Sequence, residues 1–149
     1  MSVYMCDFEL LDKGSRVVAV PIGLDGATEG YDFEDAVRMA ADWLRETALD
    51  FQMRGEEWPD LPLGTEPNAG GRMVTMAVDA SLDQVPAMTA AEAARTLGVS
   101  TARVAQLCKA GHLESWRVGG TRMVSADSVE DRLAEDRGAG RPKKDLVTA

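Results

Sequence analysis

Two acidic residues close to the N-terminus are the first candidates for chemistry in this chain of 149 residues. Asp7 and Glu9 alternate with Phe8 and Leu10, so both carboxylates would lie on one face of a strand. Two such carboxylates can hold a metal ion for phosphoryl chemistry. A metal nuclease would need further carboxylates at the same point, so we favour a solvated surface pair. We therefore predict no catalytic residue and keep a metal nuclease as a minor alternative.

Cysteine and histidine give little support for a metal site. Cys6 and Cys108 lie outside any CxxC motif, and His112 is the only histidine. One histidine does not complete a zinc site with two distant cysteines. The sequence therefore predicts no metal, no cofactor and no enzymatic activity. We expect two free thiols in a reducing cytoplasm, with Cys108 as a small core residue.

No segment suggests a membrane or a targeting signal. The longest uncharged apolar stretch runs from about Val17 to Leu24, well short of the ~20 residues that span a bilayer. Residues 1–11 contain no basic side chain, which a secretory or transit peptide would require. We therefore expect a cytoplasmic protein with no membrane partner.

The C-terminal part carries the most informative pattern, that of a helix-turn-helix. Thr89 and Glu92 give the T-x-x-E capping box at the start of a first helix, and Gly98 suits its C-terminal end. Ser100 then caps a second helix, expected over 101–110. Two short helices joined by such a turn are typical of DNA-binding proteins.

A wing is expected after the second helix. Two strand-like runs, His112–Val118 and Thr121–Ser125, are joined by a Gly-Gly pair that can form a tight hairpin turn. Ser125 also caps a last helix, Ala126–Asp136. The expected core of this small domain consists of Ala93, Ala94, Leu97, Val104, Leu107, Cys108, Leu113, Trp116, Val118, Val124 and Leu133.

The residues left on the outer face of the second helix and on the wing are suited to DNA. Arginine and glutamine can pair with guanine and adenine edges, and hydroxyl groups can donate to phosphates. A charged outer face can also be merely solvated, but here basic groups recur on both the helix and the wing. The predicted DNA-binding residues are Ser100, Thr101, Arg103, Gln106, Lys109, Arg117, Gly119, Gly120 and Arg122.

Charge is divided unevenly along the chain. Residues 1–88 carry 17 acidic and 6 basic side chains, a net charge of −11, whereas residues 89–149 carry 8 acidic and 10 basic, a net charge of +2. An acidic half attracts basic proteins, and a weakly basic half can approach phosphates. We expect an acidic protein-binding or oligomerisation domain at 1–81, a linker at 82–88, a DNA-binding domain at 89–137 and a basic flexible tail at 138–149; the resemblance described below implies that the protein bound by the first domain is a toxin.

The N-terminal part is expected to fold as strand, strand, helix, strand, which is an α+β arrangement. Strands are expected at Val3–Leu11 and Arg16–Ile22, and at Arg72–Val78 after a long loop rich in proline and glycine. Between them, apolar residues recur at helical spacing from Asp32, a capping candidate, to about Gly55.

This order of elements resembles the HicB-like antitoxin domain. The shared features are a strand ending in proline, a T-x-G step and an acidic helix start, carried by Pro21, Thr28, Gly30, Glu34, Asp35 and Ala36. The Pro-Gly-Cys usual in that family is replaced here by Leu24-Asp25-Gly26. The resemblance implies a partial ribonuclease-H-like fold without activity, which covers a small basic ribonuclease toxin of the HicA-like kind. An unrelated small α+β domain is the alternative.

The stretch from Thr89 to Val124 resembles the excisionase and MerR-type winged helix-turn-helix family. It follows nearly throughout the pattern T-x-x-E-A-A-x-x-L-G-V-S-x-x-x-V-x-x-L-x-x-x-G-x-L-x-x-x-R-V-G-G-x-R-x-V. This resemblance implies that the second helix and the wing bind operator DNA.

Together these patterns predict an antitoxin with two domains. Its N-terminal domain would neutralise a small RNA-cleaving toxin, and its C-terminal domain would bind operator DNA and repress its own operon. The alternative is an excisionase-like or MerR-like transcription or recombination factor whose N-terminal domain only oligomerises. In both cases we expect a homodimer or higher homo-oligomer, with an exposed edge strand at Val3–Leu11 as the pairing surface.

Overall fold

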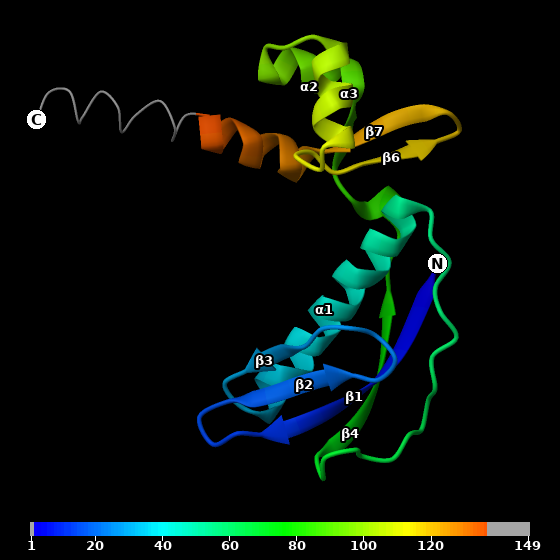
Figure 1. The fold of residues 1–149 in the computed structure, drawn as a ribbon, viewed down its shortest axis with the longest axis vertical. Helices are drawn as coiled ribbons and strands as arrows, with labels where there is room; N and C mark the ends of the chain where they lie inside the picture. The colour runs from blue at the N-terminus through cyan, green and yellow to red at the C-terminus, as the bar shows by residue number, and fades with distance from the viewer. Residues whose placement is uncertain (1, 137–149) are drawn as a thin grey trace, which may run out of the picture. The chain divides into compact units, whose positions relative to one another are not determined.

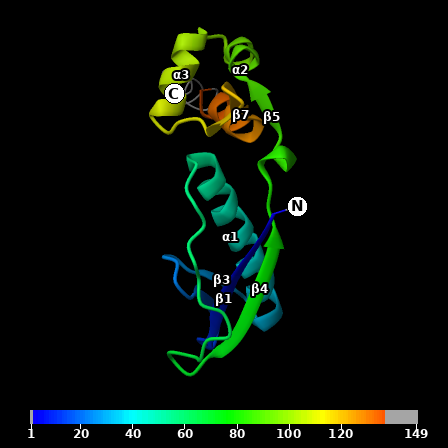
Figure 2. The same ribbon diagram turned by 90° about the vertical axis from the view of Figure 1, so that its right-hand side faces the viewer.

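A computed structural model describes residues 2–136, and Met1 and residues 137–149 lie outside the described part (Figures 1 and 2). The tail predicted at 138–149 therefore falls outside it. The chain divides after Leu82 into two compact units. Both units combine helices with an antiparallel sheet, so the predicted α+β class is confirmed. In the described part, no helix combines the length and the apolar character that crossing a bilayer requires.

The first unit is a four-stranded sheet with one long helix (Figure 1). Its elements are β1 (Val3–Asp12), β2 (Val17–Pro21), β3 (Thr28–Gly30), α1 (Phe33–Arg54) and β4 (Arg72–Asp79). The strand order is β3-β2-β1-β4, and every neighbouring pair is antiparallel. The short strand β3 is an addition to the predicted order, and it comes from the glycine-rich segment between the second strand and the helix.

α1 begins and ends where the sequence signals predict. The Asp32 carboxylate accepts a hydrogen bond from the backbone N of Asp35 at 2.8 Å, and Gly55 ends the helix with a left-handed φ of 67°. The buried stripe of α1 consists of Ala36, Ala40, Leu44 and Ala48. These mostly small side chains let the helix lie close to the sheet. A Cβ at Gly30 would stand 2.3 Å from the backbone N of Ala36, so the close approach of β3 to α1 requires glycine.

β1 is an inner strand, so the predicted exposed edge at Val3–Leu11 is wrong. Its second half pairs with β2, and nearly its whole length pairs with β4. β4 takes this place because Met76 and Val78 bury their side chains in the same core as Phe8. The edges of the sheet are therefore β3 and β4.

Asp7 is buried, contrary to the solvated pair that the sequence predicted. It lies on the face of β1 opposite the core residue Phe8, but the long loop after α1 covers that face. One oxygen of Asp7 accepts hydrogen bonds from the backbone N and the hydroxyl of Thr65, both at 2.8 Å, and the other accepts from the Thr75 hydroxyl at 2.6 Å. Burial raises the pKa of Asp7, but these hydrogen bonds outweigh it and hold the pKa below its usual value.

Glu9 is buried on the same face and binds the same loop. Its two oxygens accept hydrogen bonds from the backbone N atoms of Asn68, Ala69 and Gly71 at 2.8–2.9 Å. The Gly71 amide lowers the pKa of Glu9 against the opposing effect of burial, and the other two amides lower it further. The two carboxylates thus fasten the loop to the sheet.

The second unit contains two short helices, a small sheet and a last helix. Its elements are β5 (Ala87–Thr89), α2 (Ala90–Leu97), α3 (Thr101–Lys109), β6 (Ser115–Val118), β7 (Thr121–Ser125) and a helix at 126–136, after a short 3-10 turn η1 (Leu82–Gln84). The strand order is β5-β7-β6, and β6 with β7 forms the predicted wing. β6 begins at Ser115, three residues later than expected, because the backbone N atoms of His112 and Leu113 still bond to the Leu107 carbonyl at the end of α3.

Part of the expected linker belongs to the second unit. β5 pairs with β7, placing Met88 opposite Val124, and the backbone N of Ala126 donates to the Pro86 carbonyl at 2.9 Å. A strand of three residues is too short to show a periodic pattern in the sequence.

The core of the second unit contains most of the predicted residues, with Leu97 and Cys108 only partly buried at its border, Val118 and Leu133 outside it, and Val129 as an unpredicted member. Its buried apolar residues are Ala93, Ala94, Val104, Leu107, Leu113, Trp116, Val124 and Val129. Val118 is 60% exposed because it lies beside the turn of the wing, at the tip of the hairpin. On the last helix Val129 is fully buried, whereas Leu133, one turn further on, is only half-buried.

Candidate nucleic-acid interface

The turn between α2 and α3 is fixed by local hydrogen bonds. The Thr89 hydroxyl accepts from the backbone N of Glu92 at 3.2 Å, and the Glu92 carboxylate accepts from the backbone N of Thr89 at 2.9 Å. This is the predicted capping box. Gly98 ends α2 with a φ of 69°, and the backbone N of Val99 donates to the Ala94 carbonyl at 3.0 Å. The helix-turn-helix geometry is therefore encoded by neighbouring residues.

α3 presents one polar face outward. Ser100 caps the helix by accepting a hydrogen bond from the backbone N of Arg103 at 3.1 Å. Val104 and Leu107 anchor the other face in the core. The predicted residues on the outward face are all exposed: Thr101, Arg103, Gln106 and Lys109.

The outward face of α3 has the chemistry for reading a DNA groove. Arg103 donates from Nη1 to Oε1 of Gln106 at 3.3 Å, so the guanidinium and the amide lie side by side. Each group can make two hydrogen bonds to a base edge in the major groove. The hydroxyl groups of Ser100 and Thr101 lie at the helix N-terminus, where the helix dipole favours phosphate.

The wing places two arginines directly opposite each other. Gly119 and Gly120 have φ values of 55° and 89° and form the turn, as predicted. Arg117 on β6 faces Arg122 on β7 across the hairpin. Arg117 donates to the Gly120 carbonyl at 2.9 Å, and Arg122 donates to the Ser115 hydroxyl at 3.2 Å. Like charges in this position are destabilising, so an anion such as a DNA phosphate would relieve the repulsion.

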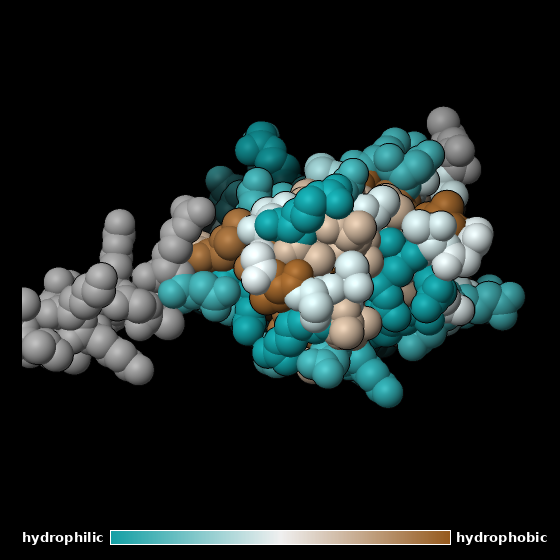
Figure 3. Space-filling model, turned by 90° about the horizontal axis from the view of Figure 1, so that it is seen from above, coloured by the Kyte–Doolittle hydropathy of each residue, from teal (hydrophilic) through white to brown (hydrophobic). Residues whose placement is uncertain are grey.

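Most acidic residues of the described second unit lie on its last helix. The last helix carries the exposed acids Asp127, Glu130, Asp131, Glu135 and Asp136. Arg132 lies within 3.9–4.0 Å of two of them. α3 itself contains no acidic residue. Figure 3 views the face that carries α2 and α3, where hydrophilic side chains surround pale, weakly apolar ones and a few strongly hydrophobic ones. This separation of charge leaves α3 and the wing as the surface that can approach phosphates.

The structure gives no metal role to the cysteines or to the histidine. Cys6 is buried and Cys108 is half-buried, and neither is in a disulfide. His112 is exposed. Within residues 2–136 there is no group of three or more His, Cys, Asp or Glu side chains that could hold a metal ion.

Comparison with known proteins identifies the second of the two units. The family model described as a helix-turn-helix domain matches residues 87–137, about a third of the chain. No curated protein and no solved structure matches this chain. The second unit is therefore a helix-turn-helix domain with a wing, and DNA is the partner that this class of domain binds. These comparisons give the HicB-like resemblance of the first unit no support.

Two supports of this interface were not predicted from the sequence. Ser115 holds the guanidinium of Arg122, and β5 completes the sheet beneath the wing. Neither carries a local signal, because both depend on pairing between strands. The match to the helix-turn-helix family nevertheless begins at Ala87, the first residue of β5.

Proposed function

We propose that the chain is an antitoxin that represses its own operon. The observation that carries the proposal is the exposed polar face of α3 next to the paired arginines of the wing. This surface is our evidence for operator binding by the second unit. Our evidence for binding of a basic toxin is the acidity of the first unit and its HicB-like order of strands and helix. The proposal includes no catalytic step.

In this proposal α3 lies in the major groove. Arg103 and Gln106 contact base edges, while Arg117 and Arg122 contact the phosphate backbone. The acidic last helix faces away from the DNA. One such domain makes few contacts, so two copies of the chain would bind two half-sites of the operator.

The toxin-binding role rests on charge. A small toxin that cuts RNA needs positive charge to bind its substrate. Residues 1–88 carry a net charge of −11, which attracts such a partner and speeds their encounter. An acidic domain that covers the basic surface of the toxin would block access of RNA to it.

Replacing Arg103 by Ala tests the DNA-binding part of the proposal. Binding is measured by fluorescence anisotropy at fixed salt with the DNA that precedes the chain's own coding sequence. We expect Arg103→Ala to weaken binding by roughly 1–3 kcal/mol, because a base contact is lost. Arg45→Ala, which removes the same charge from the first unit, is the control. If Arg103→Ala binds this DNA with wild-type affinity, the base contacts must come from a surface other than this face of α3.

Co-expression with the product of the neighbouring gene tests the toxin-binding part. We expect a short basic protein that copurifies with the full chain and whose toxicity the chain suppresses. If the neighbouring product neither copurifies nor is toxic, while operator binding persists, the excisionase-like or MerR-like factor becomes the better description.

A further inference from the structure

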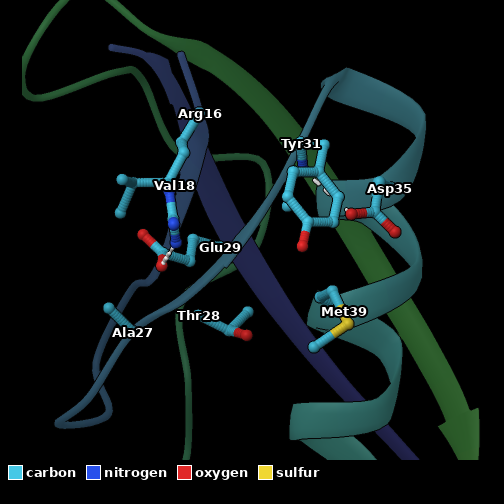
Figure 4. A pocket seen from close by; sticks show the side chains of 9 residues that line it. Arg16, Val18, Ala27, Thr28, Glu29, Tyr31, Asp35 and Met39 are labelled. Atoms are coloured by element: carbon cyan, nitrogen blue, oxygen red, sulfur yellow. Dashed lines mark hydrogen bonds and ion pairs between the residues drawn. The ribbon is translucent and has the colours of Figure 1, made fainter.

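A hollow of about 580 Å³ opens at the free edge of β3, beside the first turns of α1 (Figure 4). Its walls combine apolar side chains with acidic ones. They include Val18, Glu29, Tyr31, Asp35 and Met39. β3 is the last strand on its side of the sheet, so no further strand covers this edge.

Tyr31 stands out from the surface at this hollow. Its side chain is 82% exposed, the highest value among the exposed large hydrophobic residues of the described part. Its backbone is nevertheless held, because its N donates to the Asp35 carboxylate at 2.9 Å, and the N of Asp35 donates to Asp32. Because the Tyr31 ring lies in solvent, it contributes little to the core. The ring is therefore free to contact another molecule.

A second hollow of about 360 Å³ lies on the other side of Tyr31. It is lined by Asp12, Asp32 and Phe33, among others, and the Phe33 ring already carries the guanidinium of Arg72 at 3.9 Å from its centre. An aromatic ring on this surface thus already binds a cation within the chain. The Tyr31 ring has no such partner among residues 2–136.

The charge around Tyr31 favours a cation. Arg16, the basic residue of the larger hollow, is paired with Glu29 on the same side of it, away from Tyr31 and Asp35, as Figure 4 shows. Asp35 and Asp32 form no ion pair within the described part of the chain, and the hydrogen bonds that they accept there come from backbone N–H groups at the start of α1, so each still carries a full negative charge that a cation can approach. The exposed thioether of Met39 lies at the same hollow, where the alkyl chain of an arginine or lysine could contact it.

We propose that the hollow beside Tyr31 binds a basic segment of a partner protein, with an arginine or lysine side chain between the Tyr31 ring and the Asp35 carboxylate. The ring face attracts the cation and the carboxylate neutralises it. Nucleic acid is disfavoured because the acids repel phosphate. The inference rests on the proposed function in one respect: we expect the basic segment to belong to the toxin.

Selection of peptides on the full chain tests the proposal without knowledge of the toxin. The probe is a phage-displayed library of random twelve-residue peptides, selected in parallel on the wild-type chain and on Tyr31→Ala. Enriched peptides are synthesised, and their affinity is measured by fluorescence polarisation. Tyr31→Phe keeps the ring, and Glu46→Gln removes an exposed acid of α1 that does not line the hollow. Urea unfolding followed by the fluorescence of Trp43 and Trp58, which lie in the first unit, is the check on the folding of each variant.

We expect the peptides enriched on the wild-type chain to contain arginine or lysine. Tyr31→Ala should weaken their binding at least about threefold, whereas Tyr31→Phe and Glu46→Gln should stay close to wild type. The proposal is overturned if no peptide is enriched over Tyr31→Ala, if the enriched peptides lack basic residues, or if Tyr31→Ala binds them as tightly as wild type.

Two further outcomes would name a different occupant and also overturn the proposal. If basic peptides are enriched on chain 1–136 but not on the full chain, the basic tail at 138–149 competes with them and is itself the occupant of the hollow. A dimer that Tyr31→Ala converts to a monomer in sedimentation would make a second copy the occupant. These results are separate from the proposed function, since toxin that copurifies equally with wild type and Tyr31→Ala would leave the antitoxin role intact and remove only this surface.

Discussion

Asp7 and Glu9 show how single buried residues hold the first unit together. Each carboxylate accepts three hydrogen bonds, all from the loop after α1 except the one from Thr75 on β4. Both pKa values lie below the usual ones, so folding stabilises the charged forms. Their contribution to stability is therefore present at neutral pH and is lost as the pH falls through the folded-state pKa values.

Replacing Asp7 by Asn should destabilise the first unit by about 1–3 kcal/mol at neutral pH, because an amide cannot accept all three hydrogen bonds. The difference from wild type should shrink as the pH falls below the usual value of 3.8, because the unfolded chain then takes up the proton first and the folded carboxylate becomes protonated at a still lower pH. Urea unfolding followed by tryptophan fluorescence measures this in a Trp116→Phe background, which leaves only Trp43 and Trp58, both in the first unit.

The control for this change is Asp25→Asn, at an exposed position in the turn before β3. It should leave the midpoint of unfolding unchanged. Equal effects of the two substitutions, or a difference between wild type and Asp7→Asn that does not depend on pH, would contradict the role given to Asp7.

Cys6 and Cys108 should differ in reactivity in the folded protein. Cys6 is fully buried, and burial is the main cause that raises its pKa to about 11. Its thiolate is therefore scarce at pH 8, and reagents cannot reach it. We expect a maleimide to label only Cys108 in the native chain and both cysteines in urea, as mass spectrometry would show. Cys108→Ser should then abolish native labelling, and persistent labelling of that variant would mean that the first unit opens readily.

At the scale of elements, local signals predicted helix ends well and strand partners poorly. The caps at Asp32, Thr89 and Ser100 involve residues three positions apart, so the sequence contains both partners within one turn. The pairing of β1 with β4 joins segments about 70 residues apart. The long loop between α1 and β4 contains no signal that tells beside which strand β4 will pair. That pairing makes β1 an inner strand, and the loop that leads into β4 covers the face carrying Asp7.

The strand β5 gives a prediction at the same scale. It pairs with β7, and the Pro86 carbonyl accepts from the backbone N of Ala126 at the start of the last helix. Without β5, Met88 no longer covers this side of Val124. We expect segment 83–149 to unfold cooperatively on heating and segment 90–149 to melt at a lower temperature or without a transition. Circular dichroism measures both, and equal melting temperatures would mean that β5 adds no stability.

At the scale of the whole molecule, the two parts of the chain differ in charge, since residues 1–88 carry a net charge of −11 and residues 89–149 one of +2. Each unit has its own buried core, formed by Phe8, Leu44 and their neighbours in one and by Val104, Val124 and theirs in the other. Separate cores allow separate folding. The acidic unit repels DNA, whereas α3 and the wing of the other can approach it. Two binding functions can therefore exist in one short chain without competing for one surface.

This separation leads to a prediction for the isolated units. If the first unit carries the self-association that the proposed function includes, segment 83–149 should bind the operator more weakly than the full chain, because two copies are no longer brought onto two half-sites. Segment 1–82 should bind the toxin alone, with association that slows as salt rises because exposed charges are screened beyond about 8–10 Å. Anisotropy with operator DNA and stopped-flow fluorescence with the toxin, each at several salt concentrations, measure the two. Fusing segment 83–149 to an unrelated dimerising domain should restore operator affinity. Toxin bound by 83–149 and not by 1–82 would reverse the assignment of the two units.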